Sequence, residues 1–97
     1  MSERDPRAVA ETAQPRLSPG VRLQFDANRQ AWLLLAPERI IETEGPTHEI
    51  LSRCDGKRTV GQIVDELARM YAADRAAITA DVSELLGELA AKRVIAL

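Results

Sequence analysis

The chain has 97 residues, 45% of them hydrophobic, and its 13 basic and 15 acidic side chains give a formal net charge of −2 at pH 7. A chain of this length folds as one domain with a single core and leaves little room for an enclosed active-site cavity. The charge balance provides no overall positive field for phosphates, so nucleic acid is disfavoured as a partner.

Residues 1–15 differ in composition from the rest of the chain. They are polar, include two prolines and have Val9 as their only branched aliphatic residue. Such a segment buries too little apolar surface to offset the entropy lost on ordering. We therefore expect a disordered tail or linker over residues 1–15 and one folded domain over residues 16–97. No signal-peptide core and no membrane-length apolar run occurs, so we expect a cytoplasmic protein with no membrane partner.

Two strands are predicted between residues 21 and 36. Val21, Leu23 and Phe25 alternate with polar residues at the period of a half-buried strand. The run QAWLLLA follows the polar break DANR and indicates a second, more thoroughly buried strand. The pair closes most simply as an antiparallel hairpin.

The stretch APERIIETEG, residues 36–45, is compatible with a helix or a strand. A proline followed by an acid suits the first turn of a helix, whereas Ile40, Ile41 and Thr43 are β-branched and favour a strand. The Gly-Pro pair at residues 45–46 would end a helix after about eight residues, too short to be stable by itself. We predict an edge strand, on which Glu42 and Glu44 discourage unwanted pairing.

Three helices are predicted after residue 46. The first begins near Thr47 and ends before Gly56. The second starts at a capping box formed by Thr59 and Gln62, and Asp74 is expected to cap the third. The third helix has an apolar stripe at helical spacing. This stripe consists of Ile78, Val82, Leu85, Leu86 and Leu89.

The C-terminal residues KRVIAL are expected to form a short extended segment over the core. The order of elements predicts an α+β fold, in which an N-terminal three-stranded antiparallel β-sheet precedes a three-helix bundle. This arrangement is winged-helix-like.

Catalytic and metal chemistry are poorly supported. His48 and Cys54 lie on the same predicted helix, but a spacing of six residues places them about 120° apart around its axis. Cys54 shares the apolar stripe of that helix, where a free cysteine is usually a core residue. One cysteine and one histidine cannot supply the ligands of a zinc site. We therefore expect no catalytic residue, no metal and no cofactor.

Three segments resemble the PqqD family, the small peptide chaperones of pyrroloquinoline quinone (PQQ) biosynthesis. They are WLLLAPERII, ILSRCDGKRTVGQIVDELARMY and DVSELLGEL. The central segment is the most specific, because a CDG precedes a threonine-capped amphipathic helix. The resemblance covers roughly residues 15–95.

The resemblance implies a function and a site. It implies that the domain is a recognition element for a ribosomal precursor peptide (PqqA-like), which binds by β-augmentation and is presented to a radical-SAM enzyme (PqqE-like). It also implies that the peptide lies between the third strand and the third helix. The implied peptide-binding residues are Arg39, Ile40, Ile41, Glu42, Thr43, Ile78, Val82, Leu85, Leu86 and Leu89.

Three alternatives fit the same pattern of elements. A winged-helix module could bind DNA, but from Asp74 to the C-terminus the chain has four acids and three bases. The domain could instead serve another modified-peptide pathway. A structural dimerisation domain would pair its edge strand with a second copy, so the expected assembly is a monomer or a weak or strand-swapped dimer.

Overall fold

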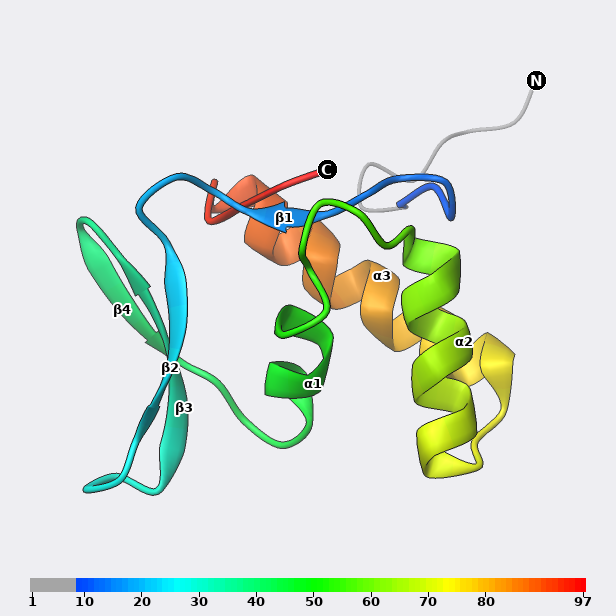
Figure 1. The fold of residues 1–97 in the computed structure, drawn as a ribbon, viewed down its shortest axis with the longest axis horizontal. Coiled ribbons are helices and arrows are strands. Elements are labelled where there is room, and N and C mark those ends of the chain that lie inside the picture. Colours follow the sequence, from blue (N-terminus) through cyan, green and yellow to red (C-terminus); the bar gives the residue numbers. More distant parts are fainter. Residues whose placement is uncertain (1–8) are drawn as a thin grey trace.

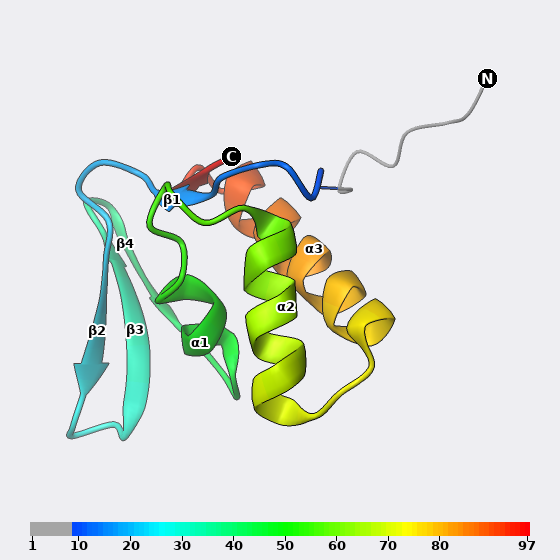
Figure 2. The same cartoon turned by 45° about the vertical axis from the view of Figure 1, so that its right-hand side comes forward.

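The fold places a three-stranded antiparallel sheet beside three helices (Figure 1). The structure is a computed structural model that describes residues 9–97, and all element counts refer to this range. The sheet has the order β2–β3–β4, with strands Arg22–Asp26, Ala31–Ala36 and Arg39–Glu42. The helices are α1 (Thr47–Leu51), α2 (Val60–Tyr71) and α3 (Arg75–Ala91). α1 lies between the sheet and α2 (Figure 2).

A second, two-stranded sheet joins the beginning of the domain to its end. β1 (Arg16–Leu17) pairs antiparallel with β5 (Ile95–Ala96). The amide of Ser18 extends this contact by donating to the carbonyl of Val94 at 3.0 Å. The α+β class is confirmed, but the predicted order of one sheet followed by helices is incomplete. The short extended segment predicted within KRVIAL is confirmed as β5, whereas β1 and its pairing with β5 were not predicted, because a strand of two residues has no periodicity.

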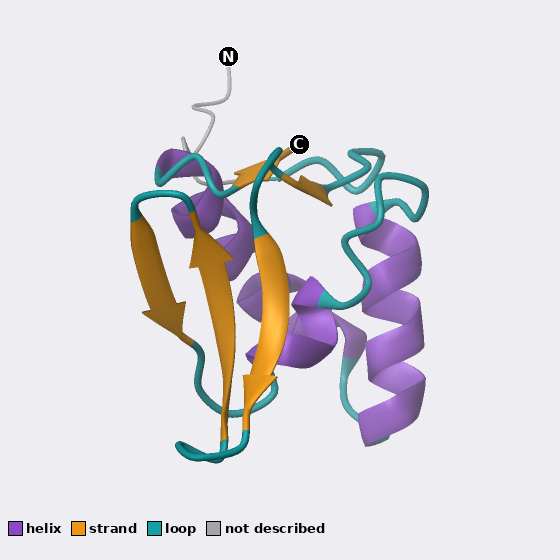
Figure 3. Cartoon of the chain, turned by 60° about the vertical axis from the view of Figure 1, so that its left-hand side comes forward, coloured by secondary structure: helices purple, strands orange, loops and turns teal. Residues whose placement is uncertain are grey.

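Residues 36–45 contain an edge strand, as predicted. Pro37 and Glu38 form the turn between β3 and β4, and β4 pairs with β3 alone within residues 9–97 (Figure 3). Ile41 is half-buried on the helix side of the sheet, whereas Ile40 is 61% exposed on the other face. Gly45 then adopts a left-handed φ of 55°, which leads the chain away from β4 and into α1.

Residues 9–15 are packed against the start of α2, which corrects the expected disorder for this part of the tail. The carbonyls of Glu11 and Ala13 accept hydrogen bonds of 2.9 and 2.8 Å from the first two amides of α2. The first amides of a helix have no partner within the helix. The segment is therefore ordered by main-chain hydrogen bonds, which its composition does not reveal. The rest of the predicted tail, residues 1–8, lies outside the described residues.

The two predicted helix caps have different outcomes. The capping box is confirmed, because the Gln62 amide donates to Thr59 Oγ1 at 3.1 Å and the Thr59 amide donates to Gln62 Oε1 at 2.8 Å. Asp74 occupies the N-cap position of α3, but its side chain makes no capping hydrogen bond. Its expected capping role is therefore wrong, although the helix begins where predicted.

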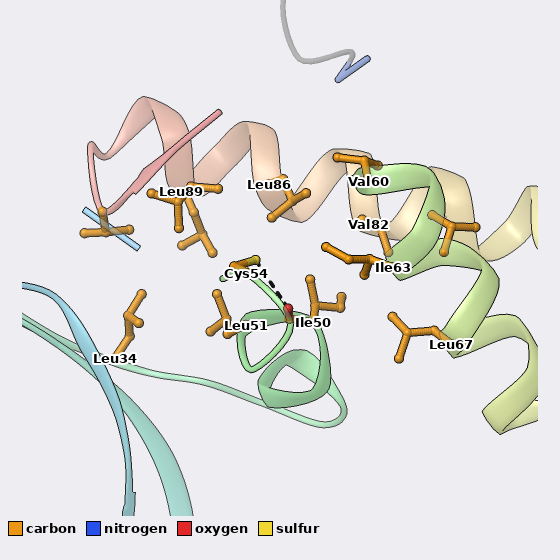
Figure 4. Packing of buried hydrophobic residues seen from close by; sticks show 13 residues of the cluster. Leu34, Ile50, Leu51, Cys54, Val60, Ile63, Leu67, Val82, Leu86 and Leu89 are labelled. Atoms are coloured by element: carbon orange, nitrogen blue, oxygen red, sulfur yellow. Dashed lines mark hydrogen bonds between the residues drawn. The ribbon is translucent and has the colours of Figure 1, made fainter. Parts of the chain in front are cut away.

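One hydrophobic core joins the main sheet to the three helices of residues 9–97 (Figure 4). Leu34, fully buried in β3, points from the sheet toward Leu51 of α1 and Leu89 of α3. Burial of one such side chain contributes about 1.5–3 kcal/mol. These contacts fix β3 against the helices, and the β3–β4 pairing then determines where β4 lies relative to α3.

Cys54 belongs to this core. Its Sγ donates a hydrogen bond to the carbonyl of Ile50 at 3.3 Å. Burial raises the pKa of the Cys54 thiol to about 12, and the nearby Asp55 carboxylate acts in the same direction. A thiol must ionise before it attacks, so the structure supports the predicted structural role of this residue.

The pKa of Cys54 leads to a reactivity prediction. At pH 8 the thiolate fraction of the folded chain is about a thousandfold below that of an ordinary cysteine. We therefore expect the native protein to react with a disulfide reagent such as DTNB about a thousandfold more slowly than the urea-unfolded protein. Similar rates in the two states would contradict the burial described here.

Candidate functional site

The outer edge of β4 presents main-chain groups that no strand of residues 9–97 covers. The amide of Thr43 donates to a carbonyl of β3 at 3.0 Å. Hydrogen-bonded pairs alternate along an antiparallel ladder. The register therefore directs the main-chain groups of Arg39, Ile41 and Thr43 toward β3. Ile40 and Glu42 direct their amides and carbonyls away from the sheet.

A groove of about 240 Å³ lies between β4 and α3. Its apolar lining consists of Leu34, Ile41, Leu51, Leu85 and Leu89. Its polar lining consists of Glu42, Thr43, Glu44, Thr47, Glu88 and Lys92. α3 contributes one face, with residues 85, 88, 89 and 92 at helical spacing. The groove thus combines an apolar floor with a charged rim, directly beside the open edge of β4.

The structure separates the predicted site residues into five groups. Ile41, Glu42, Thr43, Leu85 and Leu89 line the groove. Arg39 lines an adjoining hollow, and Ile40 lies on the opposite face of the sheet with only its main chain directed to the open edge.

The other predicted residues lie away from the groove. Val82 and Leu86 are fully buried in the core. Ile78 lines a separate apolar hollow of about 170 Å³ that it shares with Leu67 and Tyr71. The structure therefore does not bring the whole α3 stripe into the groove.

Several groove residues were not predicted from the sequence. Leu34 and Leu51 contribute to its floor, whereas Glu44, Thr47, Glu88 and Lys92 contribute to its rim. Glu88 is an exposed residue of α3, and it is exposed at the groove. The spacing of Leu85, Glu88, Leu89 and Lys92 was the signal that could have identified this face.

Charged side chains are paired mainly on the side of α1 and α2. Arg53 and Arg58 each contact Glu66 at 3.0 Å. Burial acts to raise the pKa of Glu66, but the hydrogen bonds from Arg58 and Arg53 outweigh it and the pKa lies below its usual value. Among residues 9–97, the groove-rim residues Glu88 and Lys92 form no ion pair.

Two further hollows adjoin the groove. One, of about 330 Å³, surrounds the β3–β4 turn and shares Lys92 with the groove. The other, of about 490 Å³, shares residues 42–44 with the groove. It is lined by aromatic rings, of which Trp32 and His48 stack with centroids 5.2 Å apart. An extended chain along β4 would meet all three surfaces.

The described residues provide little for covalent or metal chemistry. Within residues 9–97, no three His, Cys, Asp or Glu side chains are grouped so that they could hold a metal ion. The thiol of Cys54 is buried in the core, away from the groove lining. No helix of the described range is long and apolar enough to cross a membrane. What the site offers is a shaped surface with free hydrogen-bonding groups.

Comparison with known proteins identifies relatives. The sequence profile of the family described as "Coenzyme PQQ synthesis protein D (PqqD)" matches residues 31–95. A "PqqA binding protein" of Rhodopseudomonas palustris (strain HaA2) is 47% identical over 85 residues, which cover 88% of this chain and 83% of the relative. A protein of the same name from Xanthomonas oryzae pv. oryzae (strain PXO99A) is 44% identical over 90 residues, covering 93% and 98%.

Two solved structures are similar to this fold. The solution structure of the PqqD truncation of Methylobacterium extorquens PqqCD has a TM-score of 0.82 and 42% identity, covering 95% of this chain and 98% of that one. It is described as a functional, stand-alone recognition element for ribosomally synthesised and post-translationally modified peptides (RiPPs). The crystal structure of PqqD from Xanthomonas campestris has a TM-score of 0.59 and 39% identity, covering 93% and 100%.

Two adjacent leucines of α3 provide a test of the division between core and groove. Leu86 is fully buried, whereas Leu85 is half-buried at the groove. We expect Leu86→Ala to lower the free energy of unfolding by about 3 kcal/mol and Leu85→Ala to lower it by no more than about 1 kcal/mol. Urea denaturation measures both. A larger loss for Leu85→Ala would place that side chain in the core.

Proposed function

The chain belongs to the PqqD family, and from that premise we propose that it binds a ribosomal precursor peptide of the PqqA type by β-augmentation at β4. The observation that carries the proposal is the open edge of β4 beside the apolar groove. An extended segment that pairs with such an edge gains main-chain hydrogen bonds, and pockets for alternate side chains provide specificity. The names of the relatives, PqqA binding protein and RiPP recognition element, support the same function.

The free energy of main-chain hydrogen bonding limits how much strand pairing can contribute to the affinity for the peptide. Ile40 and Glu42 each offer one outward amide and one outward carbonyl. Hydrogen bonds at about 0.5–1.5 kcal/mol each sum to about 2–6 kcal/mol for four. Millimolar binding already requires about 4 kcal/mol net of the association cost. Main-chain pairing alone is therefore too weak, and the guest must also bury side chains between Ile41, Leu85 and Leu89.

We further infer that the bound peptide is presented to a radical-SAM enzyme of the PqqE type. The sheet face opposite the helices remains uncovered within residues 9–97 (Figure 3), so a peptide in the groove leaves this face accessible to a second protein. The description of the family as a PQQ synthesis protein supports a role in that pathway. A binding role is also supported by the description of the similar M. extorquens domain as a recognition element. The described range offers no comparable support for DNA binding, since Glu42, Glu44 and Glu88 surround the groove.

The proposed pairing is tested at Ile40. Proline at this position removes an amide that points away from the sheet, whereas proline at Ile41 would remove one that pairs with β3. We expect Ile40→Pro to weaken binding of the R. palustris PqqA peptide about tenfold in isothermal titration calorimetry, because a hydrogen bond is lost and the ring obstructs the approaching strand.

Ile40→Ala is the matched control for this test, because it removes the side chain and keeps the amide. We expect it to bind the peptide as the wild-type chain does. Equal affinities for Ile40→Ala and Ile40→Pro would contradict augmentation at β4. Circular dichroism of both variants verifies that the helices remain folded.

Presentation is tested by ternary assembly. We expect size-exclusion chromatography of the chain, the PqqA peptide and a PqqE-type enzyme to yield one complex that contains all three components. With the Ile40→Pro variant, the peptide should elute separately from the complex of the chain and the enzyme. If the enzyme binds the peptide equally well without this chain, the presenting role is wrong.

A further inference from the structure

The groove and the hollow around the β3–β4 turn adjoin each other along β4. Lys92 lines both of them. β4 and α3 run in opposite directions along the path through the groove and the hollow, because Arg39, at the start of β4, lies in the hollow with the C-terminal end of α3. Residues 41–44 line the groove with Leu85, Glu88, Leu89 and Lys92, of which only Lys92 also lines the hollow. The path therefore has two distinguishable ends.

The end near the start of β4 is basic. Arg39, Lys92 and Arg93 line it, and Glu38 is its only acid among the lining residues of the described range. Lys92 and Arg93 also complement the negative end of the α3 dipole. Arg39 comes from the strand and has no such role. Three cations from two sides of the hollow, against one carboxylate, leave an excess of positive charge.

The end near residue 44 is acidic. Glu42, Glu44 and Glu88 line this part of the groove. Within residues 9–97 these three carboxylates and the three cations of the basic end form no ion pair, although Arg53, Arg58 and Arg75 all do. Arg39 and Glu44 are five positions apart, which corresponds to about 17 Å of extended chain. Because this exceeds the Debye length of about 8 Å at physiological salt, the outermost charges, Arg39 and Glu44, act on different parts of a guest. Glu88 and Lys92 are only one helical turn apart, so the acidic and basic ends meet near the middle of the path.

We propose that the groove selects a peptide with a defined order of charges, acidic beside the start of β4 and basic beside residues 42–44. This inference rests on the proposed function, because it specifies the guest of the same site. The order of charges is defined by position along β4. It is therefore the same whether the guest strand runs parallel or antiparallel to β4. The unpaired charged side chains on the rim gain ion-pair partners only when the guest binds with its acidic part beside the start of β4 and its basic part beside residues 42–44. A guest with the reverse order of charges meets like charges at both ends. The charge order therefore sets the register of the peptide, which main-chain pairing alone leaves free to slip by two residues.

The test is a charge scan of the R. palustris PqqA peptide at low salt. Each residue is replaced in turn by Glu and by Lys, and the two dissociation constants are compared. We expect the preference to change sign along the peptide, with Lys favoured about two- to fivefold on one flank and Glu favoured by a similar factor on the other, because exposed ion pairs contribute about 0.3–1 kcal/mol each. A preference of constant sign, or none, overturns the inference.

Charge-reversal variants of the protein assign each flank. In the double variant Glu44→Lys, Glu88→Lys, the peptide flank that favours Lys should instead favour Glu, and the flank that favours Glu should keep its preference. In the double variant Lys92→Glu, Arg93→Glu, the flank that favours Glu should instead favour Lys, and the flank that favours Lys should keep its preference. Glu84→Lys is the matched control, because Glu84 is exposed on α3 and does not line the groove. It should alter neither flank. The single variant Glu88→Lys makes the same change in charge as Glu84→Lys, so equal effects of these two variants would show that only net charge matters and would overturn the proposal.

Failure of this inference is distinguishable from failure of the proposed function. A peptide that binds with the expected sensitivity to Ile40→Pro but shows no charge order contradicts the inference alone. A peptide whose binding is insensitive to Ile40→Pro contradicts the site itself, and with it the inference.

Discussion

The structure depends on the fixed separation between β4 and α3. β3 is held against the helices by the burial of Leu34 in the common core. β4 is held to β3 by the main-chain ladder. The distance between β4 and α3 is therefore set through β3, and direct contacts between β4 and α3, which would close the groove, are not needed. Gly45 then turns the chain into α1, and the segment that follows β4 does not fold back onto its open edge. The hydrophobic core beneath the groove thus keeps the open edge of β4 apart from the facing side of α3.

This arrangement divides the polar groups of the protein into two kinds. Around α1 and α2, Arg53 and Arg58 are satisfied by Glu66, and the first amides of α2 are satisfied by the segment before β1. Along β4, the outward main-chain groups and the rim charges have no partner within residues 9–97. Unpaired main-chain groups at a sheet edge can pair with strands of other chains, which favours aggregation. Their concentration around one groove is the physical basis for assigning that groove to a guest peptide.

The sequence predicted the features that depend on local pattern. The β-branched residues of 36–45 and the stop at Gly45 identified the edge strand, and Thr59 with Gln62 identified the start of α2. It could not predict that residues 9–15 supply carbonyls to α2, because any residue provides a carbonyl. It also could not divide the α3 stripe, since Leu85 and Leu86 are neighbours in sequence and only packing decides that Leu86 is core and Leu85 lines the groove. The spacing of Glu88 and Lys92 places them on one helix face with Leu85 and Leu89, but it does not show whether that face meets solvent or a cleft.

Peptide pairing at β4 is measured most directly by amide hydrogen exchange along this strand, with and without the PqqA peptide. In the free protein, the amides of Arg39 and Ile41 should be protected by β3, and those of Ile40 and Glu42 should exchange freely. When the peptide binds, the amides of Ile40 and Glu42 should become protected, while those of Arg39 and Ile41 should change little. Protection of Ile40 and Glu42 in the free monomer, or their continued free exchange in the complex, would contradict it.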